Sequence, residues 1–145
     1  MGESPVRQKG PVLLVTGGGR GIGAATALLA AQRGYRVCVN YRRDADAARA
    51  LVDGIVADGG EAIAVQADVG QQADVTRLFE AVDERLGTVS ALVNNAGVLE
   101  TQCRVEDLDE ERLLRILRTN VLGTVLPSRE AVRRMSTAHG GHGGA

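Results

Sequence analysis

The chain has 145 residues and a net charge of −1, which fits one ordinary domain and leaves no room for two within it. Lys9 is the single lysine among 17 basic residues, and the nearly neutral balance excludes a global attraction to nucleic acid or to a membrane surface. Residues 1–10 are polar and lack the apolar core of a signal peptide, so we expect a flexible leader on a cytoplasmic protein.

Short apolar segments alternate with longer helical patterns along the chain. The strands are expected at 12–15, 37–41, 62–67 and 91–93. The helices are expected from Ile22 to Gly34, from Asp44 to Gly59, from Asp74 to Leu86 and from Asp109 to Met135. This order predicts an α/β fold, the first half or more of a doubly wound, three-layer Rossmann-like parallel sheet with strand order 3-2-1-4 and its C-terminal strands missing. We divide the chain into a leader over 1–10, an incomplete Rossmann domain over 11–135 and a flexible glycine-rich tail over 136–145.

Three of the expected helices show apolar stripes, and the stripe of the helix over 74–86 passes through Val75, Leu78, Phe79 and Val82. The first helix carries a mostly apolar stripe at Ile22, Ala25, Leu28, Leu29 and Gln32, which is typical of an amphipathic helix. The last helix carries its apolar residues on one side, at Leu113, Ile116, Leu117, Val121 and Leu122. Gly123 and Pro127 are expected to bend this last helix.

The sequence VTGGGRGIG, residues 15–23, concentrates glycine directly after the first expected strand. Glycine costs about 0.5–1 kcal/mol relative to alanine in a regular element, so the cluster needs a compensating use. A strand that runs into a glycine turn and then a helix brings free N–H groups to one point, which favours a phosphate. Gly17 would turn the chain, Gly21 would let a pyrophosphate approach, and Gly23 would let the helix pack closely. A purely structural turn is the alternative.

The spacing Thr16-Gly17-x-x-x-Gly21-Ile22-Gly23 resembles the TGxxxGxG cofactor motif of the short-chain dehydrogenase/reductase family. Further segments match this family in the same order along the chain. They are Asp68 after the third strand, Asn94-Asn95-Ala96-Gly97 after the fourth, and Asn120 in the long helix. The resemblance covers nearly the whole chain, from Pro11 to about Gly144.

The resemblance implies an oxidoreductase that transfers a hydride between a nicotinamide cofactor and an alcohol or carbonyl substrate. It also implies Asn120 as the catalytic asparagine, at a place where the helix backbone holds a water for proton relay. The cofactor contacts expected from the motifs and their surroundings are Gly17, Gly19, Arg20, Gly21, Ile22, Gly23, Tyr41, Arg42, Arg43, Asp68, Val69, Asn95, Ala96 and Gly97. The alternatives are an ordinary turn at 94–97, a helix-capping acid at Asp68 and a tolerated polar residue at Asn120.

The end of the second strand indicates which cofactor the site prefers. A carboxylate there accepts bonds from a ribose 2′-hydroxyl, whereas an arginine meets a 2′-phosphate. Here Arg42 and Arg43 follow the strand, no acid precedes them, and Arg20 in the glycine turn adds a further cation. We therefore predict NADP(H), with NAD(H) less favoured. The alternative is a solvated basic face in which Arg42 and Arg43 pair with Asp44 and Asp46.

The resembled family transfers its proton with a Ser and a Tyr that is followed four residues later by a Lys. The tyrosines here, Tyr35 and Tyr41, both lie upstream, Lys9 precedes the first strand, and Ser136 falls at the end of the long helix. We therefore expect an N-terminal fragment of such an oxidoreductase, inactive alone. A non-catalytic dinucleotide-binding or regulatory module is the alternative.

The remaining expectations concern substrate, assembly and metal. Sugars, steroids and 3-oxoacyl thioesters all stay open as small-molecule substrates. An exposed apolar face with Leu113, Leu117 and Val121 would favour a homo-oligomer, a dimer or tetramer. No metal site is expected, because His139 and His142 flank glycines in the flexible segment HGGHGG, which has little to hold a metal geometry. The two cysteines, 38 and 103, lack metal-ligand spacing and are interpreted as reduced thiols, with a disulfide left open.

Overall fold

The computed structural model of the chain describes residues 9–145, so most of the predicted leader over 1–10 lies outside the described residues. Its 4-stranded sheet has the order β3-β2-β1-β4. The strands are β1 (Val12–Val15), β2 (Arg36–Tyr41), β3 (Ala62–Gln66) and β4 (Ala91–Val93). All neighbours are parallel, and Leu14 of β1 stands opposite Cys38 on one side and Leu92 on the other. The predicted fold class and strand order are confirmed.

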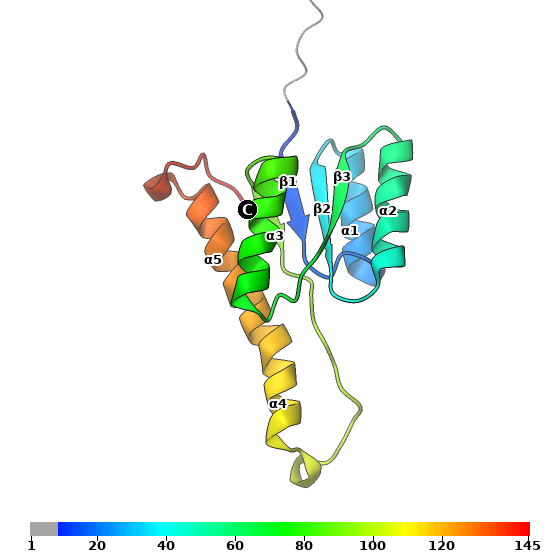
Figure 1. The fold of residues 1–145 in the computed structure, drawn as a ribbon, viewed down its shortest axis with the longest axis vertical. Coiled ribbons are helices and arrows are strands. Elements are labelled where there is room, and N and C mark those ends of the chain that lie inside the picture. The colour runs from blue at the N-terminus through cyan, green and yellow to red at the C-terminus, as the bar shows by residue number, and fades with distance from the viewer. Residues whose placement is uncertain (1–8) are drawn as a thin grey trace, which may run out of the picture.

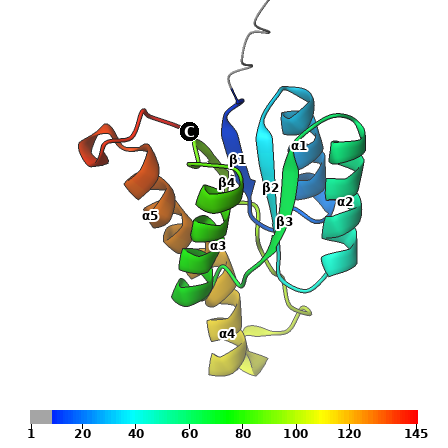
Figure 2. The ribbon, with the colours of Figure 1, turned by 45° about the horizontal axis from the view of Figure 1, so that its top comes forward.

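Helices cover both faces of this sheet (Figure 1). On one face lie α1 (Gly21–Gln32) and α2 (Ala45–Ala57), and on the other lie α3 (Gln72–Arg85) and α5 (Gly123–Met135). Helix α4 (Glu110–Leu117) extends beyond the sheet in both views (Figures 1 and 2). Because the strands are parallel, their carboxyl ends meet at one edge, the edge from which α4 extends.

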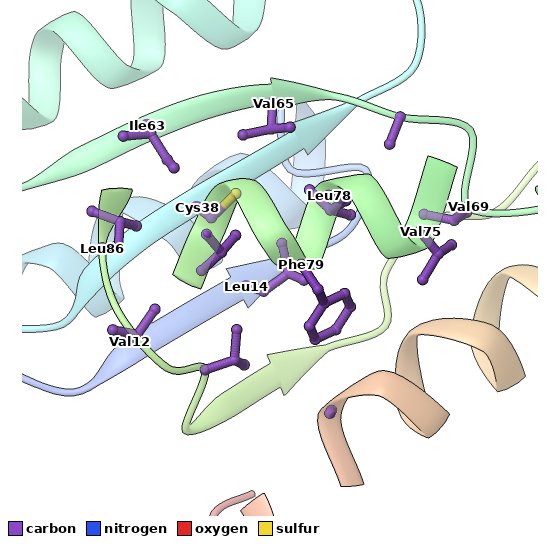
Figure 3. Close-up of a cluster of buried hydrophobic side chains, with 14 residues drawn as sticks. Val12, Leu14, Cys38, Ile63, Val65, Val69, Val75, Leu78, Phe79 and Leu86 are labelled. Carbon is purple, nitrogen blue, oxygen red and sulfur yellow. The ribbon is translucent and has the colours of Figure 1, made fainter. Parts of the chain in front are cut away.

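The strands bury both of their faces, which explains their continuous apolar sequence. Leu14 and Cys38 face α3, where Leu78 and Phe79 are fully buried (Figure 3). The alternate residues of the same strands face α1 and α2, in a cluster that includes Val15, Val39, Ala27, Ala48 and Ile55. The sheet therefore forms a rigid frame for the segments that leave its carboxyl edge.

Helix α1 packs on the sheet through its small residues. Gly23 and Ala27 are its buried positions, whereas Ile22, Leu28 and Leu29 are 80%, 38% and 48% exposed. The predicted helix is confirmed, but the stripe that suggested it is not the buried face. Small side chains on the inner face let the helix lie closer to the sheet than a row of leucines would allow.

The single helix predicted over 109–135 is interrupted. Helix α4 ends at Leu117, a π-helical turn spans Arg118–Leu122, and α5 then begins at Gly123. Figure 1 shows the resulting change of direction between α4 and α5. Pro127 lies inside α5, so the irregularity precedes both residues that were expected to cause a bend. A π-helical turn is rare and frequently marks a functional site.

The segment 136–145 returns to the sheet after a short 3₁₀ turn at Thr137–His139. The Ala145 N–H donates to the Ser90 carbonyl at 3.1 Å, and the Ala145 carbonyl accepts from Leu92 at 2.8 Å. This is the pattern of a parallel bridge on the outer edge of β4. The segment thus has a defined course, while its flexibility stays a prediction.

Two further observations bear on the surroundings of the protein. None of the helices within 9–145 has the length and apolar character needed to cross a membrane. Cys38 is buried, Cys103 is exposed, and both are free thiols. The disulfide that the sequence left open is therefore absent between them.

Candidate functional site

A cavity of about 570 Å³ opens at the carboxyl edge of the sheet. It is bounded by the glycine turn after β1, the ends of β2 and β3, and the segment after β4. The predicted site residues that line it are Gly17, Gly19, Arg20, Gly21, Ile22, Tyr41, Arg42, Arg43, Asp68, Val69, Asn95, Ala96 and Gly97. Segments far apart in sequence thus meet in one crevice. Gly23 and Asn120 do not line the cavity, but both contact residues that do.

The N-terminus of α1 faces this cavity without a capping side chain. Arg20, the N-cap residue, has extended backbone and makes no side-chain capping bond, and the first turn holds no acid. The first N–H groups of an α-helix have no acceptor inside the helix, and the helix dipole places about +0.5 charge at this end. These free donors are therefore suited to an anion.

Two glycines of the turn are required by close backbone contacts. Gly17 has a φ of +59°, and a Cβ on it would stand 2.9 Å from the Ala96 Cα. A Cβ on Gly23 would stand 2.6 Å from the Gly17 carbonyl oxygen. Beside Gly21, a Cβ would meet no atom within 4 Å, so this side of the turn is open. The geometry agrees with the turning and packing roles expected from the sequence.

Thr16 ties the segment after β4 to the glycine turn. Its buried Oγ1 accepts from the Asn95 N–H at 3.0 Å and from the Ala96 N–H at 3.1 Å. The Asn95 Nδ2 in turn donates to the Thr16 carbonyl at 3.1 Å and to the Gly17 carbonyl at 2.9 Å. Asn95 therefore holds two walls of the cavity together in addition to lining it.

Asn40 is a buried residue of this site that the sequence analysis missed. Its Oδ1 accepts from the Gly17 N–H at 3.2 Å, and its Nδ2 donates to the Val65 and Ala67 carbonyls at 3.3 and 3.2 Å. It joins the glycine turn to the end of β3 beneath the cavity. An amide inside the apolar strand VCVNY is the signal that could have found it, because a buried amide requires partners.

Three arginines border the cavity where β2 meets the glycine turn. The Nε of Arg42 lies 3.1 Å from the Asp68 Oδ2. Arg20 and Arg43 form no ion pair with any residue of the described range 9–145. Two cations are therefore available to an anionic group, and the third is shared with a carboxylate.

The sequence left open that Arg42 and Arg43 pair with Asp44 and Asp46, but these two acids have other partners in the structure. Asp44 caps α2 by accepting from the Ala47 N–H at 3.0 Å, and the exposed Asp46 lies 3.8 Å from Arg49. Within the described residues neither acid forms an ion pair with Arg42 or Arg43, so the expected pairing with Asp44 and Asp46 is wrong. The carboxylate of Asp44 is engaged by the first turn of α2 instead, although Asp44 also lines the cavity.

Asp68 is fixed by the turn that follows β3. Its Oδ1 accepts from the Gly70 N–H at 3.0 Å, and its own N–H donates to the Asp74 Oδ2 at 2.8 Å. That backbone hydrogen bond, aided by Arg77, holds the pKa of Asp74 below its usual value. Asp68 is thus a well-anchored carboxylate on the cavity wall.

Asn120 lies in the π-helical turn and binds the segment after β4. Its Oδ1 accepts from the Val98 N–H at 2.8 Å, and its Nδ2 donates to the Val98 carbonyl at 2.9 Å. Val98, to which Asn120 is hydrogen-bonded, and Thr119, which precedes Asn120 in the chain, both line the cavity. The side chain of Asn120 is therefore committed to holding the wall, and its backbone lies in the irregular turn.

Glu100 anchors the loop between β4 and α4, another contact that the sequence analysis missed. Arg115 of α4 donates to both of its carboxylate oxygens, at 2.8 and 3.2 Å, and Arg112 lies 3.5 Å away. The hydrogen bond from Arg115 holds the pKa of Glu100 below its usual value. This contact fixes α4 relative to the segment that lines the cavity.

The chain is similar to known oxidoreductases over almost its whole length. The short chain dehydrogenase family matches residues 11–143. The uncharacterized oxidoreductase YgfF of Escherichia coli is 52% identical over 134 residues, which cover 92% of this chain and 54% of that protein. A probable tetrahydroxynaphthalene reductase of Zymoseptoria tritici is 42% identical over 130 residues, 90% of this chain and 48% of the other.

Solved structures agree with these matches. A short-chain dehydrogenase/reductase from Serratia marcescens superposes with a TM-score of 0.82 and 36% identity, covering 86% of this chain and 51% of that one. A short chain dehydrogenase from Burkholderia cenocepacia, in complex with NADP, has a TM-score of 0.80 and 37% identity, covering 87% and 51%. The chain therefore spans about half the length of the relatives it matches.

Proposed function

The chain belongs to the short chain dehydrogenase family, and on that premise we propose that it binds NADP(H) in the cavity at the carboxyl edge of its sheet. The observation that carries this proposal is the uncapped N-terminus of α1, which meets arginines in one cavity. The Burkholderia cenocepacia relative was solved in complex with NADP, which supports the choice of cofactor. The chain would serve as the nucleotide-binding part of an oxidoreductase acting on alcohol or carbonyl groups.

Each wall of the cavity has a part in this proposal. The free N–H groups at the start of α1 would bind the pyrophosphate. Arg20, Arg42 and Arg43 would surround the 2′-phosphate, and a charge-assisted bond is worth about 1.5–3 kcal/mol, roughly ten- to a hundredfold in affinity. Asp68 and Val69 would flank the adenine, and the segment 95–97 would border the ribose and nicotinamide. Once bound, the nicotinamide supplies or accepts the hydride.

Asn120 is proposed as the catalytic residue of this chain. Its side-chain amide is hydrogen-bonded to the Val98 backbone. Its contribution would therefore come from the backbone of the π-helical turn, which would hold a water for proton relay. Tyr41 lines the cavity, but Lys9 precedes β1 and so lies toward the opposite edge of the sheet. Because this tyrosine has no lysine beside it, we expect residues 1–145 alone to bind nucleotide without turnover.

A non-catalytic binding module is the second candidate, and the same missing lysine favours it. Turnover assays with NADPH, the 145-residue chain and a panel that starts from 3-oxoacyl thioesters and sugars test the absence of turnover that both candidates predict for residues 1–145. Reduction of any compound in the panel would exclude the non-catalytic module. We also propose a cytoplasmic location, which the two free thiols support.

Calorimetric titration of the chain with NADPH and NADH tests the binding. We expect NADPH to bind at least about tenfold more tightly, because its 2′-phosphate meets the arginines. Arg42→Asp should remove most of this difference, while Arg33→Asp at the far end of α1 should keep it. No heat with either nucleotide would refute the proposal, and equal affinities in the parent would refute the preference for NADP(H).

A further inference from the structure

Arg42 and Asp68 meet across the wall of the cavity, although they come from different strand ends. Arg42 directly follows β2, and Asp68 comes shortly after β3, the neighbouring strand. The Arg42 Nε lies 3.1 Å from the Asp68 Oδ2, with 47% of the arginine side chain and 23% of the aspartate side chain exposed. The ion pair is thus partly open to solvent, at the place where the arginines converge.

The carboxylate approaches the Nε side of the guanidinium. A guanidinium carries five N–H donors in a rigid fork, and its terminal Nη pair matches the oxygens of a phosphate. Within residues 9–145 these Nη atoms donate no hydrogen bond to another residue. The ion pair therefore places Asp68 on the Nε side of Arg42 and leaves the Nη edge, which can bind a phosphate, available.

Asp68 can act as a fixed support because its own position is determined by backbone contacts. The Gly70 N–H binds its Oδ1 at 3.0 Å, and the Asp74 carboxylate binds its N–H at 2.8 Å. Arg42, by contrast, has a long side chain whose rotamers must be restricted when it binds a ligand. A support that restricts them beforehand reduces the loss of entropy on binding.

The negative charge of Asp68 also opposes a nearby phosphate. This repulsion acts whether or not Arg42 is present, whereas the support acts only through Arg42. The two effects can therefore be separated by removing the two residues singly and together.

We propose that Asp68 is a positioning residue that holds Arg42 by its Nε so that the Nη edge receives the 2′-phosphate of the cofactor. Asp68 would in this way set the preference of the site for a 2′-phosphorylated nucleotide, beyond any contact it makes with adenine. The inference rests on the proposed nucleotide binding.

The experiment compares adenosine 2′,5′-bisphosphate with 5′-AMP, two probes that differ only in the 2′-phosphate. Their affinities are measured by calorimetry for the parent chain, Asp68→Asn, Arg42→Gln and the double variant. We expect Asp68→Asn to lower the affinity ratio of the two probes by about three- to tenfold. In the Arg42→Gln background the same substitution should leave the ratio unchanged or raise it, because only the repulsion remains.

Two further variants complete the design. Arg42→Lys keeps the positive charge but lacks the guanidinium group that Asp68 would orient. In this background Asp68→Asn should therefore no longer lower the affinity ratio of the two probes. The single variant Arg42→Lys leaves the turn at Asp68 unaltered and, because it lacks the Nη edge, should itself lower the affinity ratio. Asp58→Asn, at the far end of α2, removes one charge from the protein and should leave the ratio as in the parent.

The outcomes distinguish this inference from the proposed function. If the parent binds neither probe, nucleotide binding itself is refuted and the inference falls with it. If the parent prefers the bisphosphate and Asp68→Asn keeps or raises that preference, only the positioning role is refuted. An equal loss with and without Arg42 would refute it as well.

Discussion

Cys38 and Cys103 carry the same thiol in opposite surroundings. Burial raises the pKa of Cys38 to about 12, whereas the side chain of Cys103 is exposed. Since the thiolate is the reactive form, we expect iodoacetamide near neutral pH to modify Cys103 alone in the native protein and both thiols in denaturant. Mass spectrometry would show this difference, with Cys103→Ser as the control that stays unlabelled when folded. Labelling of Cys38 in the native chain would contradict its burial.

Asn40 is expected to contribute more to stability than its single side chain suggests. Asn40→Ala leaves the Gly17 N–H and the carbonyls at the end of β3 without their partner, which costs about 1–3 kcal/mol of unfolding free energy. Urea denaturation measures the loss. Asn94→Ala is the matched control, because its amide binds Ser128 at an exposed position and should change stability by about 0.5 kcal/mol or less. Equal losses in the two variants would contradict the argument.

Local spacing predicts part of the candidate site, whereas Asp68, the segment 94–97 and Asn120 were predicted from the family resemblance. The glycine turn and the arginines at 20, 42 and 43 follow from the order strand, turn, helix. Asn40 and the pair of Arg42 with Asp68 depend instead on β2 and β3 being neighbours, with Asn40 opposite Val65. Sequence spacing does not specify that register, so these contacts required the structure.

At the scale of the elements, helix existence was predicted better than helix packing. Almost every residue of α1 is apolar or small, so its pattern did not show which side faces the sheet, and size decided in favour of Gly23 and Ala27. Gly123 was expected to cause a bend, but a Cβ there would stand 2.7 Å from the Val69 Cγ2. It is required because α5 passes close to the turn after β3. The π-helical turn before it is a hydrogen-bond pattern that apolar periodicity does not report.

The turn between β3 and α3 is expected to weaken in acid. The hydrogen bond from the Asp68 N–H, and to a smaller extent the contact with Arg77, lowers the pKa of Asp74 from its usual 3.8. The folded state therefore favours the charged carboxylate. Such a group adds stability above its unfolded pKa, and that stability is lost as the pH falls through the lower folded pKa. Urea midpoints of the parent and Asp74→Asn should therefore differ most near neutral pH and converge below about pH 4.

The control for this acid dependence is Asp46→Asn, which removes an aspartate whose side chain is 99% exposed. Its urea midpoint should follow that of the parent at each pH. A gap between the parent and Asp74→Asn that stays constant down to pH 3 would show that the hydrogen bond from Asp68 does not contribute in the expected way.

The whole molecule leaves a large apolar surface uncovered along α4 and α5. Leu113, Leu117 and Val121 are 42%, 42% and 49% exposed, as the sequence predicted, and Val125 and Val132 are both 56% exposed. A second cavity of about 540 Å³ lies beside this surface, between the outer edge of β4, α5 and the segment 143–145. Apolar patches of this kind on a small protein favour association.

We therefore expect the 145-residue chain to self-associate through this surface. Sedimentation velocity should show the fraction of dimers or larger species rising with protein concentration, and an environment-sensitive dye should bind. Leu117→Glu places a charge in the middle of the surface and should shift the distribution toward monomer. Leu29→Glu, on α1 across the sheet, adds the same charge at a residue that is 48% exposed and should not shift it. A parent that sediments as a monomer at every concentration, without binding the dye, would show that this surface is stable in water.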